Sequence, residues 1–139
     1  SIADDSGLCV PALNCEPGIF SARYAGCCAT DADNVSHLLL KMAGLKEADR
    51  NGYFVCAMVY MKSADDATPL IVQETWSGEI LVTPQGSEGF GYDPVFYIPE
   101  FDCSASQLDR SVKNQVSHRA KAMRKLLNDL DRSLESNKF

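Results

Sequence analysis

Two adjacent carboxylates near the start of the chain could do chemistry. Asp4 and Asp5 follow apolar residues and precede Ser6 and Gly7. Carboxylate and hydroxyl oxygens are ligands that Mg²⁺ prefers, and a glycine allows a sharp turn of the backbone. The pattern predicts a magnesium site made by Asp4 and Asp5 at the end of a strand. The same residue types also form ordinary turns, and these residues alone leave that alternative open.

A second stretch, residues 86–94, combines three glycines with two aromatic side chains, Phe90 and Tyr92, followed by Asp93. Glycine lets the backbone approach a ligand closely, and an aromatic ring can stack on a base. The stretch predicts either a purine-binding loop or a glycine-rich turn whose rings are buried. Composition does not separate the two.

Cations gather near the start of the last helix that the sequence predicts. Ser117 can cap this helix, which places His118 and Arg119 in its first turn, shortly after Lys113. Free N–H groups at a helix N-terminus, joined by such side chains, suit a phosphate or carbonyl oxygen. Cations are unfavourable at this end of the helix dipole, which points to a ligand, although exposed cations also occur at helix starts.

The remaining pattern indicates helices that must position these groups. Thr30 and Asp33 resemble a capping pair, and the apolar periodicity after them predicts an amphipathic helix that ends at Gly44. Ser104 with Gln107 predicts a capping box for a short helix. The last helix is expected to bury one apolar stripe, made by Ala120, Met123, Leu126, Leu127, Leu130 and Leu134.

Strands are predicted between these helices. Residues 53–61 are apolar throughout, which favours a central strand buried on both faces. Residues 70–83 predict a second long strand, interrupted by a bulge at Ser77 and Gly78 and paired with the first in an antiparallel hairpin. Residues 95–98 predict a short returning strand.

Composition bounds the class of protein. A chain of 139 residues with 45% hydrophobic and 23% charged residues suits a single globular domain, residues 1–139. The net charge of −6 argues against binding to a nucleic acid polymer, which requires clustered Lys and Arg. No apolar run in the sequence reaches the length that membrane insertion requires.

The six cysteines show no Cys-x-x-Cys spacing, and only two histidines accompany them. This argues against a zinc site. Their scatter suits a reducing compartment better than a disulfide framework, so we expect a cytoplasmic protein.

Four motifs in order carry a resemblance to a known family: residues 3–8, 17–26, 89–96 and 113–120. Together they resemble the inosine triphosphate pyrophosphatase family, also called the Ham1 or RdgB family, over essentially the whole chain. The resemblance implies an elongated α/β fold with a long, mixed, twisted central β-sheet flanked by helices. It also implies that the chain is the C-terminal portion of such a domain, without the strand, the Ser/Thr-x-Asn-x-x-Lys loop and the metal-binding Glu that open the family pattern.

The resemblance further implies a function. Family members hydrolyse non-standard purine nucleoside triphosphates such as ITP, dITP and XTP to the monophosphate and pyrophosphate, as Mg²⁺-dependent homodimers. By position, Asp5 would be the proton acceptor and a Mg²⁺ ligand, supported by Asp4. The implied substrate-binding residues are Ser6, Phe90, Gly91, Tyr92, Asp93, Lys113, His118 and Arg119.

Two alternatives differ in class from this expectation. The chain could be a non-catalytic module that binds a nucleotide or dimerises, because the upstream phosphate loop of the family pattern is not in it. It could also be another Mg²⁺-dependent phosphohydrolase that uses an Asp pair, in which case phosphate rather than pyrophosphate would be the product.

Overall fold

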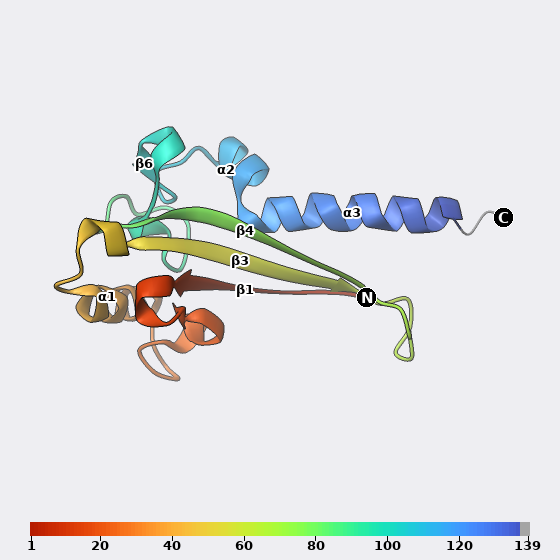
Figure 1. The fold of residues 1–139 in the computed structure, drawn as a ribbon, viewed down its shortest axis with the longest axis horizontal. Coiled ribbons are helices and arrows are strands. Elements are labelled where there is room, and N and C mark those ends of the chain that lie inside the picture. The colour runs from red at the N-terminus through yellow and green to blue at the C-terminus, as the bar shows by residue number, and fades with distance from the viewer. Residues whose placement is uncertain (137–139) are drawn as a thin grey trace.

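The computed structural model describes residues 1–136, in which one long sheet carries helices (Figure 1). The strands are β1 (Ile2–Val10), β2 (Glu16–Pro17), β3 (Asn51–Tyr60), β4 (Leu70–Ile80), β5 (Phe96–Ile98) and β6 (Cys103–Ser104). The α-helices are α1 (Asp31–Met42), α2 (Arg110–Val116) and α3 (His118–Ser136). Short 3₁₀ helices are η1 (Pro11–Leu13), η2 (Gly18–Arg23), η3 (Glu47–Asp49), η4 (Asp93–Val95) and η5 (Pro99–Phe101).

The six strands form one sheet in the order β2-β1-β3-β4-β5-β6. Every pairing among the described strands is antiparallel, whereas the family resemblance implied a mixed sheet. The predicted hairpin is present as β3 and β4, which pair from Asn51 opposite Glu79 to Tyr60 opposite Leu70. On its other side β3 pairs with β1, so the chain's opening strand lies beside the hairpin.

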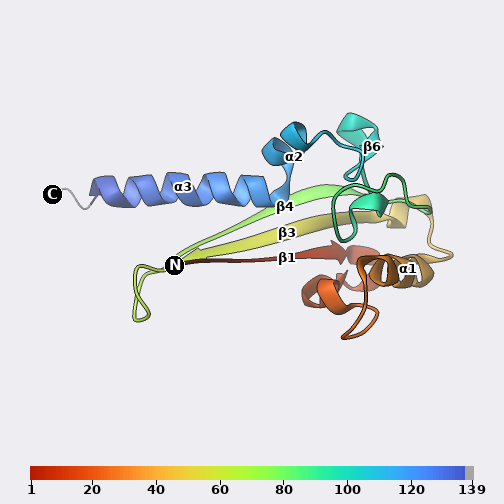
Figure 2. The same cartoon turned by 180° about the vertical axis from the view of Figure 1, so that it is seen from behind.

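Side chains alternate between the two faces of this sheet, and one face carries the core. Its residues on β1, β3 and β4 are even-numbered and divide into two buried clusters. At one end Leu8, Phe54 and Trp76 pack with α1, and at the other Met58 and Val72 pack with α3. Figures 1 and 2 show α1 near the end of β1 and α3 running along β4.

Burial on one face corrects two predictions. The odd-numbered residues of β3 are only partly buried, so this strand is not enclosed on both faces as its apolar run predicted. On α3 only Ala122 and Leu126 are buried, while Met123, Leu127 and Leu134 of the predicted stripe are exposed, because the helix rests on the sheet along a single narrow line. Within residues 1–136, no helix has both the length and the apolar character that a membrane crossing requires.

The Asp-Asp-Ser-Gly stretch does not turn. Strand β1 continues through Ser6 and Gly7 to Val10, so both the predicted strand end and the turn alternative are wrong. Gly7 instead allows η2 to approach β1 closely, because a Cβ at this position would lie 2.5 Å from the carbonyl oxygen of Gly18 in η2. The missing side chain lets η2 pack against the strand.

The helix starts agree in part with the sequence. Thr30 and Asp33 form the predicted capping box of α1, with Asp33 N–H donating to Thr30 Oγ1 at 3.2 Å and Thr30 N–H to Asp33 Oδ2 at 2.9 Å. Ser104 and Gln107 do bond to each other, but they close a turn after β6. The short helix begins later, where Asp109 caps α2.

The predicted bulge in β4 is also absent, since the register with β3 runs unbroken through Ser77 and Gly78. Gly78 is required by packing: a Cβ there would lie 2.5 Å from the carbonyl oxygen of Tyr97 and 2.7 Å from Cζ of Phe96. The glycine thus marks the place where β5, the neighbouring strand in the sheet, approaches β4 most closely.

We expect Gly78→Ala to lower the free energy of unfolding by about 1–3 kcal/mol, because the added methyl must displace the β5 backbone and the buried Phe96 ring. Urea denaturation followed by circular dichroism measures this. The neighbouring exposed Ser77→Ala is the matched control and should change stability by less than about 0.5 kcal/mol. Equal stability of the two variants would contradict the steric role of Gly78.

Candidate functional site

A cleft of about 1350 Å³ opens on the core face of the sheet. Four stretches that are distant in sequence line it: the β1 residues Asp4 and Ser6, the η2 residues Ser21 and Ala22, the loop 86–93, and residues at the end of α2 and the start of α3. These are parts of the four motifs singled out in the sequence, which the fold therefore brings to one place. Among the predicted site residues, Asp5 does not line the cleft.

Asp4 and Asp5 project to opposite faces of β1, because successive residues of a strand alternate. Asp4 faces the cleft, and its Oδ2 accepts a hydrogen bond from Arg119 Nε at 2.8 Å. Asp5 is exposed on the other face, where its Oδ1 accepts from the Ser6 N–H at 2.9 Å. The two carboxylates therefore do not converge on one point.

This arrangement limits what the pair can offer a metal ion. Residues 1–136 contain no group of three His, Cys, Asp or Glu side chains placed to hold a metal. With Asp4 engaged by Arg119, Asp5 is the free carboxylate of the motif. A single carboxylate suits Mg²⁺ bound mainly through water and ligand phosphates, and does not suit a closed protein cage.

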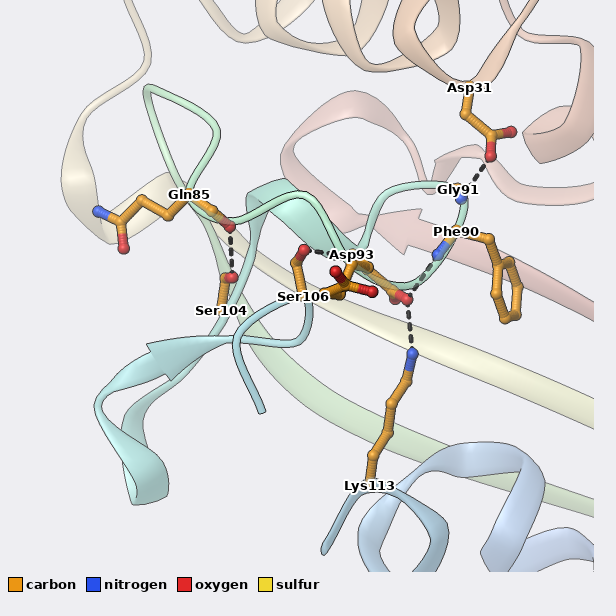
Figure 3. A network of polar contacts seen from close by, with 9 residues as sticks. Asp31, Gln85, Phe90, Gly91, Asp93, Ser104, Ser106 and Lys113 are labelled. Atoms are coloured by element: carbon orange, nitrogen blue, oxygen red, sulfur yellow. Dashed lines mark hydrogen bonds and ion pairs between the residues drawn. The ribbon is translucent and has the colours of Figure 1, made fainter. Parts of the chain in front are cut away.

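A buried carboxylate, Asp93, fixes the glycine-rich loop (Figure 3). Only 4% of Asp93 is exposed, and its Oδ2 accepts from the Phe90 N–H at 3.1 Å and from Lys113 Nζ at 2.6 Å. A buried charge requires such partners, because its desolvation would otherwise cost several kcal/mol. The ion pair ties the loop to α2 and holds Lys113 beside the cleft.

The two aromatic rings of the loop differ in burial. Phe90 is 66% exposed, with Lys113 Nζ 5.2 Å from its ring centroid, so this ring is available to a ligand. Tyr92 is buried, donates its hydroxyl to the Ser21 carbonyl at 2.6 Å, and has a pKa raised by burial. The loop therefore combines the two alternatives that composition left open. Phe90 is exposed to a ligand, and the buried Tyr92 anchors the loop to η2.

The sequence did not identify Asp31 as part of this site. Its Oδ2 accepts from the Gly91 N–H at 2.9 Å and so holds the loop from the side of α1 (Figure 3). The sequence assigned no contact to Asp31, because its partner is 60 residues away. An acidic residue in a first helical turn is too common to indicate a loop anchor.

His118 and Arg119 begin α3, as the sequence predicted, with Ser117 Oγ accepting from the Ala120 N–H at 3.2 Å. The His118 ring stacks on Phe54, with centroids 4.8 Å apart and planes inclined by 13°. Trp76 lies behind it at 6.3 Å. Neither aromatic residue was predicted to support the site, because the contact depends on α3 docking over β3 and β4.

The His118 imidazole is largely removed from water. Its Nδ1 is buried and has no hydrogen-bond partner within residues 1–136. Burial first, and then the charges of Lys113, Arg119 and Lys121, lower the pKa of His118 from 6.5 to about 4. The ring is therefore neutral near pH 7, and Arg119 carries the positive charge at this helix start.

A sequence model of the Ham1 family matches residues 1–129. The chain belongs to the Ham1 family. It is 54% identical over 130 residues to a dITP/XTP pyrophosphatase from Idiomarina loihiensis, and 54% identical over 126 residues to one from Legionella pneumophila strain Lens. These alignments cover 94% and 91% of the chain, and the chain spans 64% and 65% of the two relatives.

Solved Ham1-family structures agree with the fold. A HAM1 protein from Coxiella burnetii superposes with a TM-score of 0.89 at 44% identity, covering 94% of this chain and 66% of that one. The Ham1 protein of Staphylococcus aureus superposes with a TM-score of 0.84 at 45% identity, covering 99% and 67%. The predicted ITPase-like α/β fold is thereby confirmed.

In this Ham1-family chain, the partly buried His118 should make stability depend on pH. The unfolded chain binds a proton near pH 6.5 and the folded chain only near pH 4, so the free energy of unfolding should fall as pH drops through this window. The loss is roughly 3 kcal/mol at most. Denaturant titrations from pH 7 to pH 4 measure it.

His118→Phe should keep the stacking and flatten this pH dependence, whereas His37→Gln, at the other histidine, should leave it in place. A slope that persists unchanged in His118→Phe would contradict the assignment.

Proposed function

We propose that this protein hydrolyses non-standard purine nucleoside triphosphates, such as ITP, dITP and XTP, to the nucleoside monophosphate and pyrophosphate. The observation that carries the proposal is the meeting of all four family motifs at one cleft. Membership of the Ham1 family and the relatives named dITP/XTP pyrophosphatase support it.

Hydrolysis at the α-phosphorus requires a water molecule that loses a proton as it attacks, and pyrophosphate as the leaving group. In the proposal Asp5 accepts that proton and provides the protein carboxylate for Mg²⁺. Mg²⁺, when bound, neutralises charge on the phosphate oxygens. The exposed position of Asp5, whose one hydrogen-bond partner within residues 1–136 is the Ser6 N–H, supports both roles.

Asp5 and the cleft lie on opposite faces of β1, so a ligand that contacts both must reach from one face of the strand to the other. From Ile2 to Leu8 this strand pairs with β3 on one side, and on its other side the described β2 reaches only Cys9 and Val10. We propose that the base occupies the cleft and that the triphosphate extends past β1 to reach Asp5 on the opposite face. Ser6, next to Asp5 and on the cleft side, would contact the substrate at this crossing.

Recognition of the base is assigned to the start of α3. Hypoxanthine and xanthine carry a 6-oxo acceptor where adenine carries an amino donor. Asp4 engages Nε of Arg119, which leaves the terminal guanidinium N–H groups to donate to that oxygen. His118 contributes a neutral ring at the same place, and Phe90 offers a face for stacking. Guanine shares the 6-oxo group, so its exclusion requires other contacts.

The remaining substrate residues have supporting parts in the proposal. Lys113 would face phosphate or base while Asp93 holds it, and Gly91 and Tyr92 keep the loop in place. We also propose that the protein acts as a cytoplasmic homodimer. Large apolar side chains that remain exposed, including Ile71 on the second sheet face, are consistent with association.

Incubation with ITP and Mg²⁺, with pyrophosphate and phosphate measured separately, tests the reaction. We expect pyrophosphate from ITP, at least tenfold less from ATP, and loss of turnover by at least a hundredfold in Asp5→Asn, which removes the proton acceptor. Chelation of the metal should also abolish turnover.

Release of phosphate as the first product would contradict the proposal and favour a Mg²⁺-dependent phosphohydrolase of another kind. Binding of ITP without turnover would favour the non-catalytic module instead.

The neighbouring aspartates should separate binding from chemistry. Asp4→Asn should weaken ITP binding about tenfold and reduce the preference over ATP, because Arg119 loses a charge-assisted hydrogen bond. Asp5→Asn should leave the dissociation constant for ITP, measured without Mg²⁺, within about threefold, while turnover with Mg²⁺ is lost. Isothermal titration with a non-hydrolysable ITP analogue measures the two constants. The same effect of both substitutions on affinity would show that the opposite orientations carry no functional meaning.

A further inference from the structure

An exposed pair of cysteines lies outside the cleft. Cys27 and Cys28 follow η2 and precede α1, and both are exposed free thiols. Their Sγ atoms are 3.7 Å apart, although adjacent side chains in an extended segment point away from each other. The local backbone therefore brings the two sulfurs together.

Two hydrogen bonds hold that backbone. Ala29 N–H donates to the Gly26 carbonyl at 3.2 Å, which closes a turn with Cys27 and Cys28 at its centre. Gly26 N–H in turn donates to the Arg23 carbonyl at 3.0 Å. On the other side, Thr30 caps α1. The dithiol is preorganised between two anchored elements, which lowers the entropic cost of binding a ligand through both sulfurs.

The spacing of the sulfurs favours a bridging atom over a direct bond. A disulfide joins sulfurs about 2.05 Å apart, usually between Cα atoms about 4.4–6.8 Å apart, whereas adjacent Cα atoms are only about 3.8 Å apart. Two metal–thiolate bonds of about 2.3 Å span the observed 3.7 Å at an angle near the tetrahedral value. A linear two-coordinate ion would need sulfurs about 4.6 Å apart. The pair thus fits a thiophilic centre with bent coordination.

We propose that Cys27 and Cys28 form a chelating site for a thiophilic centre of bent geometry, of which trivalent arsenic is the test case. With an organic arsenoxide, both S–H bonds and the As=O bond are replaced by two As–S bonds, and the two protons leave with the oxygen as one water. No oxidant or reductant is consumed. The inference does not rest on the proposed function.

A second cysteine pair provides the internal competitor. Cys9 and Cys15 both lie near the Tyr53 hydroxyl, with Cys15 Sγ 3.9 Å from it. Only Cys15 of this pair is exposed, and burial raises the pKa of the Cys9 thiol. We expect this pair to react poorly, since chelation requires both thiols to be accessible and deprotonated.

Phenylarsine oxide, added at one equivalent to the reduced protein, is the probe. Intact-mass spectrometry should show one phenylarsine oxide gained with loss of one water, and titration should find four of the six thiols remaining free. Trypsin separates the candidates without any substitution, because cleavage after Arg23 and Lys41 places Cys27 and Cys28 in peptide 24–41 and the competitor pair in peptide 1–23. We expect the adduct on peptide 24–41.

Variants test the need for both sulfurs. Cys27→Ser and Cys28→Ser should each lower apparent affinity for the arsenical at least a hundredfold, while Cys15→Ser and Cys103→Ser should retain it. Thermal melts by circular dichroism confirm that each variant is folded. An adduct on peptide 1–23, retention in Cys27→Ser, or no adduct on the wild-type protein would overturn the proposal.

Discussion

Along β1, β3 and β4, side chains alternate between the two faces of one antiparallel sheet, and the core and the cleft both depend on this alternation. The same face that buries Leu8, Phe54 and Trp76 also presents Asp4. Because the period is two, a slip of one residue in β1 would move Asp4 away from Arg119 and expose Leu8. Pairing with β3 therefore fixes packing and site geometry together, and selection for one preserves the other.

The Asp93 carboxylate is the second constraint. It joins loop 86–93 to α2 through Lys113, while Asp31 holds the loop from α1 and Tyr92 reaches η2. Three separate elements thus immobilise the loop that presents the exposed Phe90. Such preorganisation lowers the ordering cost when a ligand binds. The nearby His118 stays neutral near pH 7, because burial and the surrounding cations lower its pKa.

Local signals in the sequence predicted much of this molecule. The capping box at Thr30, the long hairpin and the start of α3 depend on neighbours in sequence, and each was predicted correctly. Gly7 and Gly78 were interpreted as turn or bulge signals. In the structure both are glycines because a backbone carbonyl from another element lies too close for a side chain, and no local sequence pattern reveals that contact. The four motifs predicted which stretches meet, whereas the orientation of Asp5 away from the cleft follows from strand register alone. The contact of Asp31 with Gly91 required the assembled fold.

Asp4 and Arg119 are 115 residues apart, yet their contact closes one wall of the cleft. Contacts of such high sequence separation form late, because the loop entropy must be overcome before they can form. During synthesis, a nascent chain that has emerged only as far as β4 lacks α3 and leaves Phe54 and Trp76 without their cover. The cleft is therefore complete only once the last helix has been made and docks on the sheet.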